Sequence, residues 1–140
     1  MPARRIERII KLKEKLMEEK QRQINEVLLA IDDIINNINI IETNINMNYE
    51  HITTTTICGG DLCLIKDNMI FLENKKGELL EEKEECNKRL SLLRMELVEQ
   101  AREIKKLETL KSKILSAIKK AQNKKEQKFF DDIALHNLKE

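Results

Sequence analysis

Apolar residues recur along the first part of the chain at alternating steps of four and three residues. The steps run from Ile6 to Ile52, and between residues 24 and 45 nearly every step lands on Ile. A repeat of 3.5 residues indicates a helix that packs against another helix in a left-handed coiled coil. We therefore expect a helix over about residues 3–52. Its packing stripe, the first seam, consists of Ile6, Ile10, Lys13, Met17, Lys20, Ile24, Val27, Ile31, Ile34, Ile38, Ile41, Ile45, Asn48 and Ile52.

A second stripe with the same repeat predicts a longer helix over about residues 64–138, which is expected to overhang the first. Leu110 and Leu115 are expected to widen this stripe. Lysines at seam positions are favourable only where their stems pack and their ammonium groups reach water, so we expect the structure to be loose there. They are Lys13, Lys20, Lys76, Lys83 and Lys111. The second seam consists of Ile65, Met69, Leu72, Lys76, Leu79, Lys83, Cys86, Leu90, Leu93, Leu97, Gln100, Ile104, Leu107, Lys111, Ile114, Ile118 and Ala121.

The segment between the seams predicts a reversal of the chain. Four Thr residues at 53–56 disfavour helix, and Gly59 and Gly60 permit a turn over about residues 53–63. The chain is therefore predicted to be all-α. We expect a single domain over residues 1–140, folded as a long antiparallel two-helix coiled coil, which is a helical hairpin.

Composition and charge support this class and separate the two ends of the hairpin. The chain is 36% charged and 3% aromatic, with one Pro and three Gly, which is poor material for a compact mixed core. Residues 23–65 hold six acidic side chains and no Lys or Arg, whereas residues 105–128 hold nine Lys and two Glu. Residues 1–22 are also basic. We expect different partners at the two ends.

Candidate chemistry is sparse. His51, Cys58 and Cys63 cluster near the turn, but their spacing and the lack of further ligands do not fit a zinc site. The two glycines lack the Lys-Ser/Thr of a phosphate-binding loop. We expect no metal, no cofactor, no small-molecule substrate and no enzymatic activity. With no apolar run of about eighteen residues and an odd number of cysteines, we expect a soluble cytoplasmic chain with reduced thiols.

The basic end has the cations for nucleic acid but no stacking platform and no DNA-binding motif. We expect no nucleic acid there and instead expect an acidic protein partner.

Three segments carry a family resemblance. The segments 5–13 (RIERIIKLK), 101–111 (AREIKKLETLK) and 126–134 (EQKFFDDIA) are similar to the flagellar export protein FliJ, and the resemblance covers nearly the whole chain. It implies a coiled-coil stalk in the ring of the hexameric export ATPase, which promotes ring assembly and activity and links the ring to the membrane-embedded export gate. It also implies escort of export chaperones and a location at the cytoplasmic face of the inner membrane.

Charge and the few aromatic residues assign this chain's residues to the two implied partners. For the ATPase ring we expect contacts from Arg4, Arg5, Arg8, Lys119, Lys120, Lys124 and Lys125. For the export gate we expect contacts from Tyr49, Ile52, Met69, Phe71 and Leu72.

Four alternatives stay open at this point. The stalk of a virulence-type secretion system has the same shape and role. A prefoldin-like chaperone also has two long helices, and it predicts a β-hairpin between them, over residues 53–64. The stalk of a rotary ATPase proper usually adds a globular domain. A generic coiled-coil adaptor would show the same seams.

Overall fold

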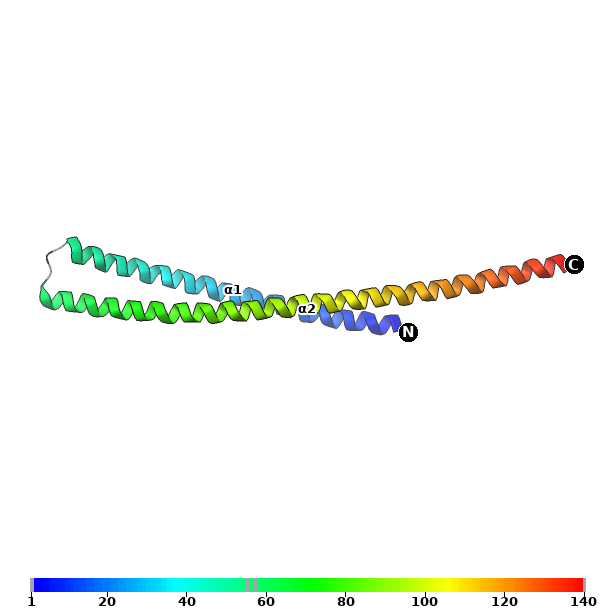
Figure 1. The fold of residues 1–140 in the computed structure, drawn as a ribbon, viewed down its shortest axis with the longest axis horizontal. Coiled ribbons are helices and arrows are strands. Elements are labelled where there is room, and N and C mark those ends of the chain that lie inside the picture. Colours follow the sequence, from blue (N-terminus) through cyan, green and yellow to red (C-terminus); the bar gives the residue numbers. More distant parts are fainter. Residues whose placement is uncertain (1, 55, 57, 140) are drawn as a thin grey trace. The chain divides into compact units, whose positions relative to one another are not determined.

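The computed structural model of the chain describes residues 2–54, 56 and 58–139, and it consists of two helices. Helix α1 spans Pro2–Thr54 and helix α2 spans Gly59–Lys139 (Figure 1). The described residues contain no strand. The all-α helical hairpin is therefore confirmed, and the described part of the connection shows none of the strands that a prefoldin-like chain would have.

The connection between the helices is shorter than the expected turn over residues 53–63. Helix α1 continues through Thr53 and Thr54, where the Thr53 hydroxyl donates to the Tyr49 carbonyl oxygen at 3.0 Å. Helix α2 already begins at Gly59, and the Leu62 N–H donates to the Cys58 carbonyl oxygen at 3.0 Å. The hydroxyls of Thr53 and Thr54 thus bond carbonyl oxygens of the preceding turn, which is compatible with a helical backbone at both residues.

Two residues of the expected turn, Thr55 and Ile57, lie outside the described residues. Among the described glycines none has a positive φ, so Gly59 and Gly60 serve as ordinary first-turn residues of α2.

Contacts within the chain group it into two compact units, each built from parts of both helices. Unit 1 comprises residues 1–19 and 97–140, and unit 2 comprises Lys20–Glu96. The expected single domain stays a prediction.

The core of unit 2 is the Ile-rich part of the first seam. Ile34, Ile38, Ile41 and Ile45 are buried together with Leu79 of α2. Met69, Leu72 and Cys86 pack against this cluster from the same face of α2. The alternation of steps of four and three therefore located the packing face of α1 correctly, because those steps place side chains on one stripe of a supercoiled helix.

The core of unit 1 is smaller. Ile6 and Ile10 of α1 are buried against Ile104 of α2, with Met17, Leu107 and Ile114 packed beside them. The prediction that two leucines widen this stripe is wrong, because Leu110 and Leu115 are 47% and 48% exposed. One helix can cover only one stripe of its partner, so residues flanking the seam stay in water.

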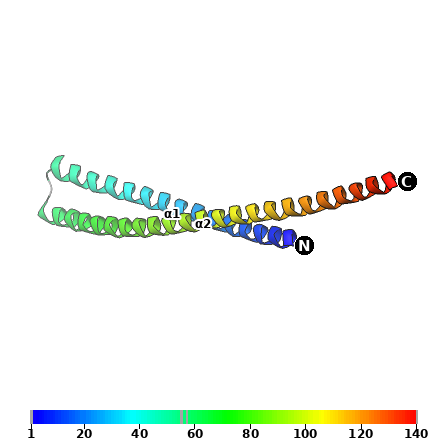
Figure 2. The ribbon, with the colours of Figure 1, turned by 45° about the vertical axis from the view of Figure 1, so that its right-hand side comes forward.

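Beyond this core, α2 of unit 1 continues without a partner helix. Every described side chain from Lys119 to Leu138 is exposed, including Ala121, the last residue of the expected second seam. We call residues 119–138 the overhang; at 1.5 Å per residue it extends about 30 Å. The end of α2 runs on past the start of α1 (Figures 1 and 2). The residues of the overhang therefore contribute nothing to the core of unit 1.

Four of the five seam lysines reach acidic residues on the opposite helix. In unit 1, Lys111 contacts Glu7 at 2.6 Å and Lys13 contacts Glu103; in unit 2, Lys20 contacts Glu96 at 2.5 Å and Lys76 contacts Glu42 at 3.2 Å. These lysine side chains are 26–30% exposed, so their stems are mostly packed while the ammonium groups leave the seam. The ammonium groups thus reach carboxylates rather than water alone, and the expected looseness stays a prediction.

Over the described residues, neither helix contains a stretch that is both apolar and long enough to cross a membrane.

Candidate partner-binding surfaces

The two units carry opposite net charge. Unit 1 has seventeen Lys and Arg against eleven Asp and Glu, whereas unit 2 has nine against fourteen. All seven cations expected to contact the ATPase ring belong to unit 1, and all are exposed. Arg4, Arg5 and Arg8 stand on the first turns of α1, and the four lysines stand on the overhang. These cations therefore lie partly where α1 and α2 pack together and partly on the overhang, where α2 is alone.

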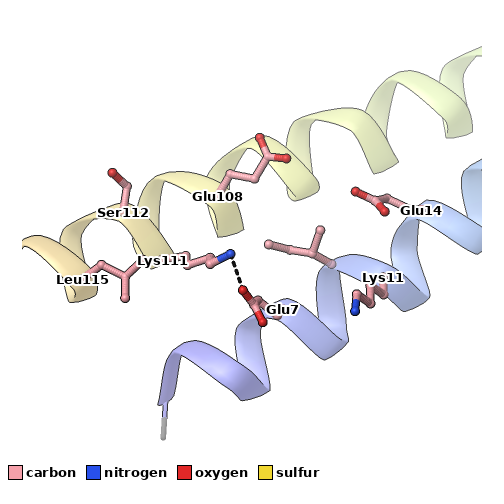
Figure 3. Close-up of a pocket in the computed structure, with 8 residues that line it drawn as sticks. Glu7, Lys11, Glu14, Glu108, Lys111, Ser112 and Leu115 are labelled. Atoms are coloured by element: carbon pink, nitrogen blue, oxygen red, sulfur yellow. Dashed lines mark ion pairs between the residues drawn. The ribbon is translucent and has the colours of Figure 1, made fainter.

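Where α1 and α2 pack together, unit 1 holds a charged pocket of about 500 Å³ that the sequence did not predict. Figure 3 shows Lys111 reaching from α2 to the carboxylate of Glu7 on α1, with Glu14 and Glu108 nearby. The hydrogen bond from the Lys111 ammonium, followed by its charge, holds the pKa of Glu7 below its ordinary value of 4.5. The full lining is Glu7, Ile10, Lys11, Glu14, Glu108, Lys111, Ser112 and Leu115.

The sequence held a signal for this pair. Lys111 occupies a seam position, where an acidic residue at a flanking position of the other helix can pair with its ammonium group. The missing information was the register, meaning which residue of α1 lies opposite residue 111. The pairs of unit 1 now supply it, since the partner on α2 moves from 111 down to 103 as the residue on α1 moves from 7 up to 13. That inverse relation is the signature of antiparallel packing.

The outward side of α2 in unit 1 carries a row of cations that we call the basic face. Thr109 and Ser116 are small residues between them, and each contributes to a shallow hollow, of about 350 Å³ and 400 Å³ respectively. No ion pair joins these cations to a described carboxylate. The cations of the basic face are Arg102, Lys105, Lys106, Lys113, Lys119 and Lys120.

The overhang ends in exposed apolar side chains. Phe129 and Phe130 are 62% and 63% exposed, with ring centroids 6.1 Å apart in an edge-to-face arrangement. Ile133, Leu135 and Leu138 follow, and all are exposed as well. A helix with lysines and then unpacked aromatic and aliphatic residues is a surface that a partner can cover.

Unit 2 holds a second candidate surface, a groove of about 660 Å³ close to the connection between the helices. Three of the five residues expected to contact the export gate line it: Tyr49, Ile52 and Met69. The other two do not, since Leu72 packs against the core of unit 2 and Phe71 is 64% exposed outside the groove. The remaining lining is Lys66, Ile70, Glu73 and Asn74.

Next to this groove lies a polar atom without a partner. Asn48 directly precedes Tyr49 at a seam position, and its Nδ2 is buried with no hydrogen-bond acceptor among the described residues. A buried donor without an acceptor lowers stability, so this layer of the seam is a weak point beside the groove.

The described residues contain no cluster of three His, Cys, Asp or Glu side chains arranged to hold a metal ion. Cys58 and Cys63 are exposed free thiols, and Cys86 is partly buried against the core of unit 2.

The described residues form a two-helix coiled coil with exposed surfaces that partners can reach. The family model described as Flagellar FliJ protein matches residues 2–139. The chain therefore belongs to the FliJ family and is a component of the flagellar export system. Searches among curated proteins and among solved structures found no match.

Proposed function

We propose that this chain is the stalk of the flagellar export ATPase: its basic unit inserts in the hexameric ring and promotes ring assembly and activity, and the groove in unit 2 contacts the export gate. Membership of the FliJ family supports the general assignment. The observation that supports insertion in the ring is the overhang, the part of α2 in which every side chain from Lys119 to Leu138 is exposed.

A helix gains most of its stability in a protein from packing, not from propensity. The overhang of residues 119–138 has no packing of its own and displays lysines on several sides. A partner that surrounds a helix, as a ring does, can cover all of these sides at once. An acidic lumen would also complement the positive charge of unit 1, which raises association rates and disfavours other partners.

The test is an ATPase assay with the same organism's export ATPase. We expect wild-type protein to activate it and the activation to fade as salt rises. The variant Lys119→Glu/Lys120→Glu/Lys124→Glu should lose activation. A matched control, Lys75→Glu/Lys88→Glu/Arg94→Glu, makes the same change in net charge at exposed positions of unit 2 and should retain it. Equal activation by both variants would refute the assignment of the ring contact.

A second contact, with the export gate, is supported by the groove of unit 2. Its floor and walls combine the ring of Tyr49 with Ile52, Met69 and Ile70, and its rim carries Lys66 and Glu73. Apolar walls with a few polar groups at the rim are typical of sites that receive a partner's side chains.

Binding of the cytoplasmic part of the gate protein tests this contact. Tyr49→Ala/Ile70→Ala removes two exposed walls of the groove and should weaken binding about tenfold or more. Phe71→Ala is the matched comparison, because Phe71 is an equally exposed aromatic residue that lies outside the groove. If only Phe71→Ala weakens binding, the gate contacts the outward side of α2 and not the groove.

The virulence-type stalk is a second candidate that the same assay separates. Activation of a virulence-type ATPase and not of the flagellar one would favour it over the flagellar assignment that the family match supports.

A further inference from the structure

The chain carries two exposed faces of opposite charge that match each other at four positions. One is the basic face of α2. The other is the outward side of α1 in unit 2, which we call the acidic face and define by Asp33, Ile40, Met47 and Glu50. Both faces are turned to solvent, so neither is used by the helix pair to which it belongs.

The acidic face combines acidic side chains with exposed large apolar ones. Ile40 and Met47 are 58% and 61% exposed, although large apolar side chains gain from burial. Asp33 and Glu50 stand on either side of them, and no described cation forms an ion pair with either carboxylate. The face therefore presents the order acid, apolar, apolar, acid.

The basic face presents the complementary order with the same spacing. Arg102 and Lys119 are the outer cations, and the hollows at Thr109 and Ser116 lie between them. On the acidic face the steps between successive positions are seven, seven and three residues, and the steps from 102 to 119 through 109 and 116 are the same. Two helices that lie parallel rise equally per residue, so all four positions can meet at once.

From this match we propose that the basic face of α2 binds the acidic face of a second copy of this chain, with the two helices parallel. Ile40 of one copy fills the hollow at Thr109 of the other, and Met47 fills the hollow at Ser116. Asp33 pairs with Arg102, and Glu50 pairs with Lys119.

Neighbouring positions agree with this register. The same offset places Asn36 opposite Lys105 and Asn44 opposite Lys113, where the amide oxygens can accept hydrogen bonds from the ammonium groups. The apolar stems of the lysines beside each hollow would cover the inserted Ile and Met side chains. No acidic residue of the second copy faces a like charge at the four defining positions.

The affinity between two copies should be low, because exposed ion pairs are individually weak and are screened by salt. We expect reversible association at high protein concentration in about 0.1 M salt, where the Debye length is about 10 Å. At about 1 M salt the Debye length falls to about 3 Å, and association should weaken roughly tenfold or more.

Sedimentation velocity of the full chain and of two charge-reversed variants tests the proposal. The first variant, Asp33→Arg/Glu50→Lys, makes both faces basic. The second, Arg102→Asp/Lys119→Glu, replaces the outer cations of the basic face by acids. Each variant alone should be monomeric, whereas an equimolar mixture should associate, because every contact is then again between opposite charges.

A control variant, Glu81→Lys/Glu85→Lys, changes two other exposed acids of unit 2 and should associate like the wild type. Four results would overturn the proposal. They are a wild type that stays monomeric in low salt, association by either variant alone, a mixture that stays monomeric, and a control that loses association.

Two probes identify another occupant of the basic face if the wild type is monomeric. Co-sedimentation with vesicles of anionic phospholipid would assign the face to a lipid surface, and binding of poly-glutamate would assign it to an acidic protein. Either result, with a monomeric wild type, replaces the second copy as the partner.

Discussion

Replacing Lys76 by Leu should stabilise the hairpin, although it removes an ion pair between the helices. Lys76 is a seam residue of α2 in unit 2, and its ammonium contacts Glu42 at 3.2 Å. The side chains of the pair are 30% and 47% exposed, so both charges are partly hydrated. Because water screens such a pair, it contributes only about 0.2–1 kcal/mol.

The packing gain is larger than that loss. Full burial of a Leu side chain contributes about 1.5–3 kcal/mol, and a seam position that leaves 30% of Lys76 exposed would realise about two thirds of it, about 1–2 kcal/mol. The stem of Lys76 already supplies part of this burial. Glu42 keeps its contact with water when the lysine is removed. We therefore expect a net stabilisation of at most about 1 kcal/mol, which for a chain of this length raises Tm by at most about 3 °C.

Urea unfolding followed by circular dichroism measures the change, with Lys75→Leu as control. Lys75 is 52% exposed and lies 3.9 Å from Glu78 on its own helix, so its replacement should change the free energy of unfolding by less than about 0.5 kcal/mol. If Lys76→Leu unfolds at lower urea than the wild type while the control does not, the ion pair outweighs seam packing and the reasoning fails.

Two further changes test the core and the charged pocket. Ile41→Ala should lower the free energy of unfolding by about 2–4 kcal/mol, because Ile41 is only 9% exposed. Ile40 is 58% exposed, so Ile40→Ala should lower it by less than about 1 kcal/mol. Equal losses in urea unfolding would contradict the assignment of Ile41 to the seam. NMR titration should give Glu7 a pKa below 4.5 that rises in Lys111→Met. Because the folded pKa is the lower one, the Glu7–Lys111 contact stabilises the fold above the unfolded pKa, and this contribution is lost as the pH falls through the folded pKa. An unchanged Glu7 pKa in Lys111→Met would show that another group causes the shift.

The sequence predicted the hairpin well because a coiled coil repeats one local rule. Every residue of the first seam from Ile6 to Ile52 is buried or partly buried, and so is every residue of the second seam from Ile65 to Ile118. Only Ala121 departs, since α2 has no partner helix there. Periodicity states which side of a helix is covered, but it does not state where the covering helix ends.

The predictions failed where the structure depends on contacts between residues that are distant in the sequence, or on hydrogen bonds that propensity does not include. Propensity placed the start of the turn at Thr53, but α1 continues through Thr54, where the hydroxyls of both threonines bond the preceding turn. The carboxylate partners of the seam lysines depend on the register of two helices distant in sequence, which the seams alone leave open. The groove beside Tyr49 depends on how the side chains of both helices meet, so only part of its lining was predicted.

The proposed ring contact and the proposed contact with a second copy use the same lysines. Lys119 and Lys120 are exposed on the overhang and also belong to the basic face. If the ATPase ring and a second copy both bind this surface, they compete, and ring binding should reduce self-association in proportion to its affinity. The weak pairing of two copies would then shield the unpacked part of α2 until an acidic partner with a larger contact area replaces it. A ring contact that left self-association intact would instead place the ring on the side of unit 1 that carries Arg4, Arg5 and Arg8.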